Sequence, residues 1–276
     1  MEPQGRPYWS PSRVTTYLRC PEQYRRAYIN RERIPPGVAL VKGGAVHRAA
    51  EVNFKQKVVT EHDLPVRDMT EAAVAHVQGT VKAEGLLLTR EEAARGVRAV
   101  EGDLIDRAVA LTELLAKRVT PSIQPALVEQ RVVIQLPHHR FDLLGYLDVA
   151  DSEGRVRDLK TSGRRKTQDE VDRSDQLTFY DLGYRALTGR PPAGVTMDVL
   201  LDQKRPDVQT LHAVRDEHDH RVYLNRLNSA VAGVAAGSFP PAPLGAWWCS
   251  PRFCGYWQTC PYVNSERASA AQEVDV

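Results

Sequence analysis

The sequence lacks several features that would place it in a familiar class at once. It has no GxxxxGK[S/T] phosphate-binding loop, so the chain does not carry a helicase motor. Its first residues, MEPQGRPYWS, lack the apolar core of a signal peptide. Ser229 to Ser250 is uncharged, but Pro240, Pro241 and Pro243 would interrupt a membrane-spanning helix. We therefore expect a cytoplasmic protein with no membrane partner.

A strong overall charge is also missing. The 276 residues carry a net charge of +2, and their hydrophobic content of 42% is ordinary for one sizeable globular domain or two small ones. The charge is uneven, because residues 1–42 hold eight basic against three acidic side chains and residues 155–166 hold six against one. Such basic stretches fit a polyanionic substrate, although a charge run is usually a solvated face.

Two strand-like runs, Leu143–Ala150 and Arg155–Thr161, flank the tripeptide Ser152-Glu153-Gly154. A three-residue loop with glycine at the left-handed position closes an antiparallel hairpin. In such a hairpin Asp148 lies directly opposite Asp158.

The predicted hairpin gathers three charges on one face. Side chains alternate along a strand, so Asp158 and Lys160 point the same way while Leu159 points the other way. The opposed Asp148 and Asp158 carboxylates repel each other unless a cation lies between them, and such hard oxygen ligands suit Mg²⁺ or Mn²⁺. Lys160 is then available for the charge that develops during phosphate chemistry. The alternative is a solvent-exposed strand pair in which Lys160 only neutralises charge.

The first 119 residues read as mainly helical. Ser10 and Pro11 predict a helix start, and Cys20-Pro21 interrupts that helix. A second helix follows Gly43 and continues through about Lys57. From Asp68 to Val119 the pattern stays helical, with a capping box over residues 89–92 that predicts the start of the longer helix. Its apolar stripe consists of Leu104, Ala108, Leu111 and Leu115. We interpret residues 68–119 as a helical insertion.

The remaining chain alternates between strands and helices. Leu127–Leu136 reads as a strand that carries Glu129, which could also be an ordinary edge-strand glutamate. Ser174–Thr188 has helical spacing and places Gln176 and Tyr180, four residues apart, on one face. The further expected elements are strands at Gly194–Asp202 and Thr210–Val214 and a helix at Asp219–Ala236.

Cysteine is scarce, and its four residues are Cys20, Cys249, Cys254 and Cys260. Four thiolates are what a [4Fe–4S] cluster or a structural zinc needs. A cytoplasmic setting disfavours disulfides, and unrelated buried thiols are a further alternative. Either metal would join the two ends of the chain.

The ordered set of motifs resembles the PD-(D/E)XK nuclease superfamily in its RecB-like exonuclease branch. The motifs are Gly43-x-x-x-His47, Gly145-x-x-Asp148, Asp158-x-Lys160-Thr161 and Gln176-x-x-x-Tyr180. One distant N-terminal cysteine with a C-terminal trio is similar to iron–sulfur members of the AddB and CRISPR-adaptation types. The spacing C-x4-C-x5-C departs from the commoner trio, whose first gap holds two residues.

The resemblance implies an α/β fold with a restriction-endonuclease-like core, a central mixed sheet flanked by helices. It also implies a helical insertion and a cysteine cluster that joins the N- and C-terminal segments. We expect residues 1–266 to form a single nuclease domain, followed by a disordered tail at 267–276. The expected parts of the domain are a helical segment at 10–119, a sheet core at 127–237 and a cysteine tail at 247–261.

The resemblance also implies a function, that of a metal-dependent deoxyribonuclease. Asp148 and Asp158 would hold Mg²⁺ or Mn²⁺, and His47 and Glu129 would complete the metal shell. Lys160 would position water or stabilise charge. The pair Gln176 and Tyr180 would support the site and contact DNA.

The implied substrate is single-stranded DNA or duplex ends in recombination, repair or phage DNA metabolism. A helicase or a recombination protein would then be the partner. The alternatives are a CRISPR-adaptation nuclease and a non-catalytic DNA-binding subunit of a helicase–nuclease complex.

Overall fold

A mixed sheet of six strands separates two groups of helices. The structure is a computed structural model that describes residues 6–137 and 139–263, so the tail predicted at 267–276 lies outside the described residues. The strands are β1 (Tyr8–Trp9), β2 (Pro125–Gln135), β3 (Asp142–Asp151), β4 (Arg155–Ser162), β5 (Gly194–Leu201) and β6 (Asp207–Ala213). Their order is β1-β3-β4-β5-β6, and β2 pairs with the other edge of β3.

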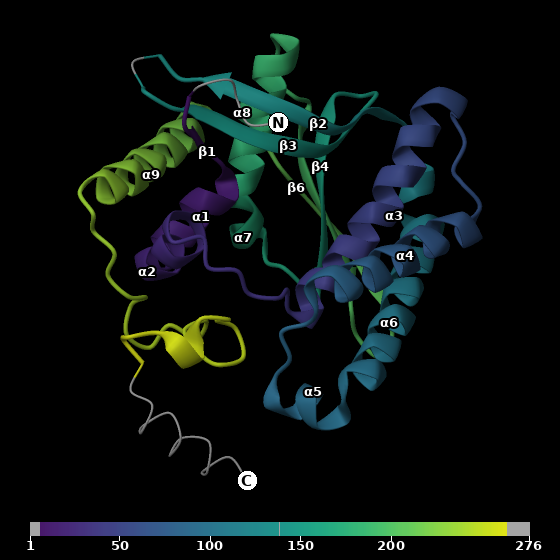
Figure 1. Ribbon diagram of the computed structural model, residues 1–276. Helices are drawn as coiled ribbons and strands as arrows, with labels where there is room; N and C mark the ends of the chain where they lie inside the picture. The colour runs from purple at the N-terminus through teal and green to yellow at the C-terminus, as the bar shows by residue number, and fades with distance from the viewer. Residues whose placement is uncertain (1–5, 138, 264–276) are drawn as a thin grey trace.

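The helices fall into two layers, which Figure 1 shows on either side of the sheet. One layer holds α3 (Val38–Thr60), α4 (Val66–Glu84), α5 (Arg90–Arg95) and α6 (Val97–Arg118). The other layer holds α1 (Pro11–Arg19), α2 (Pro21–Tyr24), α7 (Gln168–Asp172), α8 (Asp175–Thr188) and α9 (Glu217–Ala235). Short helical turns at Arg25–Ile29, Thr120–Ser122 and Trp257–Thr259 complete the described elements.

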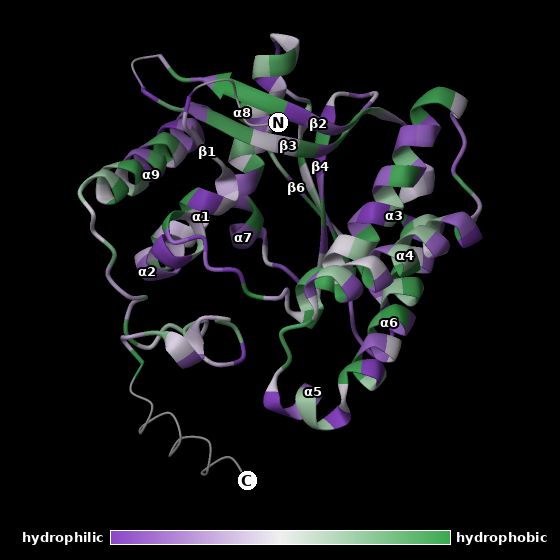
Figure 2. Ribbon diagram, in the orientation of Figure 1, coloured by the Kyte–Doolittle hydropathy of each residue, from purple (hydrophilic) through white to green (hydrophobic). Residues whose placement is uncertain are grey.

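Each layer has its own hydrophobic core against the sheet. The first core includes Val14 of α1, Phe179 of α8 and Leu227 of α9. The second core includes the predicted apolar stripe of α6 together with buried residues of α3 and α4. In Figure 2 hydrophobic and hydrophilic residues are interspersed along α4 and α6, as expected for helices with one buried face. Among the described helices, none is both long and apolar enough to span a bilayer.

Local sequence signals located most element boundaries. Ser10 caps α1 by accepting a hydrogen bond from the Arg13 amide, and Cys20 ends that helix as expected. The predicted capping box at Thr89 is present, but it opens the six-residue α5. Gly96, at φ 84°, separates α5 from the longer α6, so the prediction that the capping box opens the longer helix was wrong. The two-residue β1 was missed because its pairing with β3 is not visible in local sequence.

The basic stretch at 155–166 is largely neutralised within the fold. Its ion pairs are Arg157 with Asp151 and Asp198, Lys160 with Asp158, Arg164 and Lys166 with Glu170, and Arg165 with Asp207. Arg157 and Lys160 are held within the sheet by these pairs, whereas Arg164 and Arg165 stay 65% and 59% exposed and share their carboxylate partners with other basic residues.

Gly145 allows β3 to pack closely against α8, and this contact provides a test of the fold. A Cβ atom at position 145 would lie 2.4 Å from Cε1 of the buried Phe179. We expect Gly145→Ala to lower the free energy of unfolding by about 1–3 kcal/mol, as overpacked cores do. Gly79→Ala in α4 is the matched control, because nothing lies within 4 Å of its added methyl group. Urea unfolding should show a lower midpoint than wild type for Gly145→Ala but not for Gly79→Ala. A wild-type midpoint for Gly145→Ala would contradict the close packing.

Candidate active site

The candidate site lies where β3 and β4 separate. The two strands pair through Val149 with Arg157 and through Ala150 with Val156, which is the predicted hairpin register. Gly154 in the connecting loop has φ 80°, the left-handed conformation that the loop requires. Beyond these pairs, the Leu159 amide donates a hydrogen bond of 3.2 Å to Oδ2 of Asp148. A carboxylate therefore occupies the opening between the strands.

Glu129 lies across from Asp148 in an unusual backbone conformation. The pairs Val128–Val149 and Gln130–Leu147 flank it, and its φ is 47°. A left-handed glutamate is uncommon and costs on the order of 1–3 kcal/mol, so such residues concentrate at functional sites. The strand also changes face here, since Val128 packs in the second core while Val132 packs in the first. Local sequence pattern gave no sign of this conformation.

Three candidate metal ligands come together at this point. Ligand atoms of His47, Glu129 and Asp148 all lie within 4.8 Å of one another. Nδ1 of His47 is 3.6 Å from Oδ2 of Asp148. His47 comes from α3, so the site joins this helix to the sheet. Two carboxylates and an imidazole can bind a divalent cation such as Mn²⁺ or Mg²⁺.

Lys160 belongs to a hydrogen-bonded relay beside these ligands. Its Nζ donates to Oδ1 of Asp158 at 2.8 Å and to Oε1 of Gln176 at 2.9 Å. Gln176 donates to the Tyr180 hydroxyl at 2.9 Å, and that hydroxyl donates to Oδ1 of Asp148 at 2.7 Å. The relay therefore connects both aspartates through α8. Asp158 lies on the Lys160 side of the site and outside the group of three ligands.

Carboxylates at this site are held in conditions that disfavour their charge. Burial raises the pKa of Glu129 to about 7, and the nearby Asp148 and Glu51 add to the shift. Burial also raises the pKa of Asp158, with repulsion from Asp148 adding to it and the Lys160 ammonium opposing it. Oδ2 of Asp158 is buried and has no hydrogen-bond partner among the described residues. A bound cation would give this oxygen a partner and would reduce the repulsion between the crowded carboxylates.

His76 of α4 also faces the site but carried no signal in the sequence. It lines a cavity with His47 and Lys160. Its Nε2 would lie 2.6 Å from a Cβ atom on Gly44, so that glycine of α3 lets the imidazole approach. Burial lowers the pKa of His76, with the positive charge of Arg48 adding to it. A lone histidine in a helical pattern could not have been singled out.

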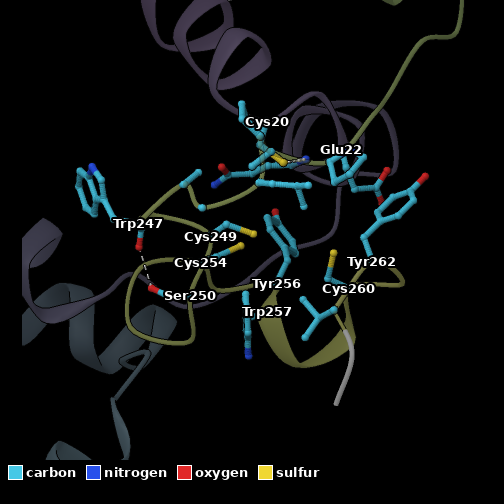
Figure 3. Close-up of a pocket in the computed structure, with 18 of the residues that line it drawn as sticks. Cys20, Glu22, Trp247, Cys249, Ser250, Cys254, Tyr256, Trp257, Cys260 and Tyr262 are labelled. Atoms are coloured by element: carbon cyan, nitrogen blue, oxygen red, sulfur yellow. Dashed lines mark hydrogen bonds between the residues drawn. The ribbon is translucent and has the colours of Figure 1, made fainter. Parts of the chain in front are cut away.

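The four cysteines meet at a second location. Cys20, Cys249, Cys254 and Cys260 surround a cavity of about 550 Å³, and Figure 3 shows their side chains around a common space. Among the described residues, no three of these sulfur atoms lie within 4.8 Å of one another. A tetrahedral zinc site with Zn–S bonds of about 2.3 Å would hold them about 3.8 Å apart. Burial raises the pKa of both Cys249 and Cys254, and the Cys20 and Cys260 thiols add to each shift.

Side chains other than cysteine also attach this tail to the rest of the chain. Arg26 donates to the Tyr256 carbonyl at 3.2 Å and to the Thr259 hydroxyl at 2.6 Å. The Tyr256 hydroxyl donates to the Glu32 carbonyl at 2.9 Å. The C-terminal tail is therefore held against the segment that follows α2, close to Cys20.

Comparison with solved structures agrees with the observed architecture. A structure described as "Putative exonuclease" from Eubacterium rectale superposes with a TM-score of 0.58 at 14% identity, covering 93% of this chain and 89% of the other. At that identity the match shows the fold alone. The structure of SSO0001 reaches a TM-score of 0.43 at 13% identity, covering 95% and 88% of the two chains, and supports no argument. No curated protein matches the chain.

Comparison with family models is more specific. The model described as "PD-(D/E)XK nuclease superfamily" matches residues 8–261, nearly the whole of the described chain. The mixed sheet flanked by helices confirms the predicted α/β fold class. This chain belongs to the PD-(D/E)XK nuclease superfamily.

Proposed function

We propose that the protein is a Mg²⁺- or Mn²⁺-dependent deoxyribonuclease that acts as an exonuclease on single strands or duplex ends. One observation carries this proposal. The Lys160 ammonium is fixed between Asp158 and Gln176, beside the ligand group of His47, Glu129 and Asp148. A fixed cation next to a divalent-metal site is suited to phosphodiester hydrolysis.

Each residue of the candidate site has a part in the proposed reaction. His47, Glu129 and Asp148 would hold a divalent ion, with Oδ2 of Asp158 available to it. When bound, such an ion supplies a Lewis acid for the phosphate and an activated water. Lys160 stabilises the negative charge that develops on phosphorus oxygens or positions the water. Gln176 and Tyr180 hold Lys160 and Asp148 in place through the relay.

The setting that we propose for this activity is cytoplasmic DNA recombination, repair or phage DNA metabolism. Because the chain has no phosphate-binding loop, a helicase or a recombination protein would provide the separated strand.

The four cysteines support a further proposal, that they hold a [4Fe–4S] cluster. A cluster needs four thiolates and more space than a single ion, which agrees with the cavity and with the sulfur spacing. The Cys20 sulfur also accepts a hydrogen bond of 3.4 Å from the Gln23 amide at the start of α2. The cluster would then join the two ends of the chain as a structural element, and zinc is the alternative.

Substitution of Lys160 tests the proposed chemistry. We expect Lys160→Ala to lower the rate of DNA hydrolysis by a factor of about 10²–10³ or more, as loss of an electrostatic group at a reacting centre does. Affinity for single-stranded DNA, measured with Ca²⁺ in place of Mg²⁺, should be retained. The exposed Lys204, between β5 and β6, provides the control Lys204→Ala, which should keep full activity. Retained turnover in Lys160→Ala would refute the role of this residue.

The raised pKa of Glu129 leads to a prediction about stability. The pKa of Glu129 is about 7 in the folded protein and 4.5 ordinarily, so folding favours the protonated form. The stability that protonated Glu129 contributes is fully present below pH 4.5 and is lost as the pH rises through 7. Metal-free Glu129→Gln should therefore be more stable than wild type at pH 8, by about 1–2 kcal/mol after allowance for solvent. Mn²⁺ should stabilise wild type more than the variant in thermal unfolding.

Glu113→Gln is the control for this experiment, because the Glu113 side chain on α6 is 46% exposed and, among the described residues, its ion pair is with Lys117 alone. It should change neither the stability at pH 8 nor the effect of Mn²⁺. If metal-free Glu129→Gln were less stable than wild type at pH 8, the charged Glu129 carboxylate would not be destabilising and the prediction would be wrong.

Metal analysis tests the cysteine site. Anaerobically purified protein should contain about four irons per chain and absorb at roughly 400 nm, as iron–sulfur proteins do. Cys260→Ser should lose the iron and lower the unfolding temperature, while Ser250→Ala in the same loop should keep both. One equivalent of zinc without iron would instead assign a zinc site.

A further inference from the structure

A groove beside the relay has no part in the proposed hydrolysis. It encloses about 550 Å³ between α1, β3 and α8, and we call it the α1 groove. Gln176 and Tyr180 line it next to Asp148, so one part of the groove adjoins the candidate active site. Gln23 lines both this groove and the cysteine cavity. The groove therefore extends from the relay toward the cysteines.

The α1 groove follows a free part of the sheet edge. On one edge of β3, Asp142 and Leu143 pair with β1, while Val149 and Ala150 pair with β4. In the described chain, residues 144–148 have no strand partner on that edge. Three of these, at 144–146, line the groove, and the segment ends at Asp148. An extended ligand lying along this edge would arrive at the candidate metal site.

The lining of the groove favours an anion. One face of α1 contributes Ser12, Thr15, Thr16 and Arg19, whereas the opposite face, with Val14, packs in the first core. No carboxylate is among the described lining residues. Arg19 has no ion pair with any described residue, and its Nε is buried without a hydrogen-bond acceptor among them. Its guanidinium carbon lies 5.6 Å from the centroid of the Trp248 ring, and its positive charge also acts on the Cys249 and Cys254 thiols. A guanidinium that has an aromatic neighbour but no carboxylate partner is suited to a phosphate.

The groove also offers an aromatic surface. Tyr146 is 49% exposed although it lies in the middle of a central strand, where large side chains are usually covered. Nucleotide bases stack on such rings, and this is possible for a single strand, whose base faces are free, but not for the interior of a duplex.

We propose that the α1 groove binds a single-stranded polynucleotide, with a base stacked on Tyr146 and a phosphate bound by Arg19, and leads the strand to Asp148 and Lys160. This proposal rests on the proposed function, because the strand it holds is the one that would be hydrolysed.

Binding of a fluorescein-labelled oligothymidylate, followed by anisotropy with Ca²⁺ in place of Mg²⁺, tests the stacking. Tyr146→Ala should weaken binding by about 5- to 100-fold, the usual effect of removing one base–aromatic stack. Tyr146→Phe should bind like wild type, because the ring is retained. Tyr262→Ala, which removes a comparably exposed tyrosine outside the groove, should also bind like wild type. Equal affinities of Tyr146→Ala and wild type for the oligothymidylate would overturn the proposal. It would also be overturned if Tyr146→Ala weakened the binding of a blunt duplex by the same factor.

Salt dependence tests the phosphate contact. In Arg19→Gln the slope of log affinity against log salt concentration should become shallower by about one, whereas Arg19→Lys should keep the wild-type slope. An unchanged slope in Arg19→Gln would remove Arg19 from the proposed contact.

Cleavage of a small phosphodiester separates the groove from the chemistry. Tyr146→Ala should hydrolyse bis(p-nitrophenyl) phosphate with Mn²⁺ at the wild-type rate, because this substrate does not reach the groove. If wild type hydrolyses neither this substrate nor DNA, the proposed function is wrong. The binding measurements still show whether the α1 groove holds a single strand. If Tyr146→Ala loses this activity as well, the substitution has disturbed the active site and a stacking role is overturned.

Discussion

The hydrogen bond from the Leu159 amide to Asp148 marks the constraint on which the site depends. Two antiparallel strands would normally continue their ladder, and here the ladder stops after Val149 and Ala150. A carboxylate occupies the opening and accepts a backbone hydrogen bond that a carbonyl would otherwise take. The same opening lets His47 approach from α3 and Tyr180 approach from α8. Both helical layers therefore meet the sheet at one aspartate.

The site is destabilising to the fold that carries it. Glu129 has a left-handed backbone and a pKa raised to about 7, and Asp158 has one oxygen without a partner among the described residues. Strain and unsatisfied polar groups of this kind concentrate where binding a ligand relieves them. The two hydrophobic cores on either side of the sheet supply the stability that tolerates them. The nuclease fold thus separates the elements that stabilise it from the residues proposed to act.

The two ends of the described chain contribute to the same surface. β1 pairs with part of the β3 edge, and the C-terminal tail packs against the segment after α2 through Arg26 and Tyr256. In Figure 1 this tail lies next to α2, far along the chain from the N-terminal segment that it contacts. The Tyr17 hydroxyl of α1 donates a hydrogen bond of 2.8 Å to the Ser238 carbonyl, so the position of α1, which lines the proposed binding groove, depends on a contact made more than 200 residues later.

The helix caps, the hairpin register and the family motifs could be predicted from the sequence, because they depend on residues that are close in the chain. Ser10, Thr89 and Gly154 act locally, and the Gln176–Tyr180 contact follows from helical spacing. The left-handed Glu129, the approach of His76 to Gly44 and the free edge at Tyr146 became visible only in the folded chain. Each of these arises where strands or helices that are distant in sequence meet, and packing between them has no signature in a local pattern.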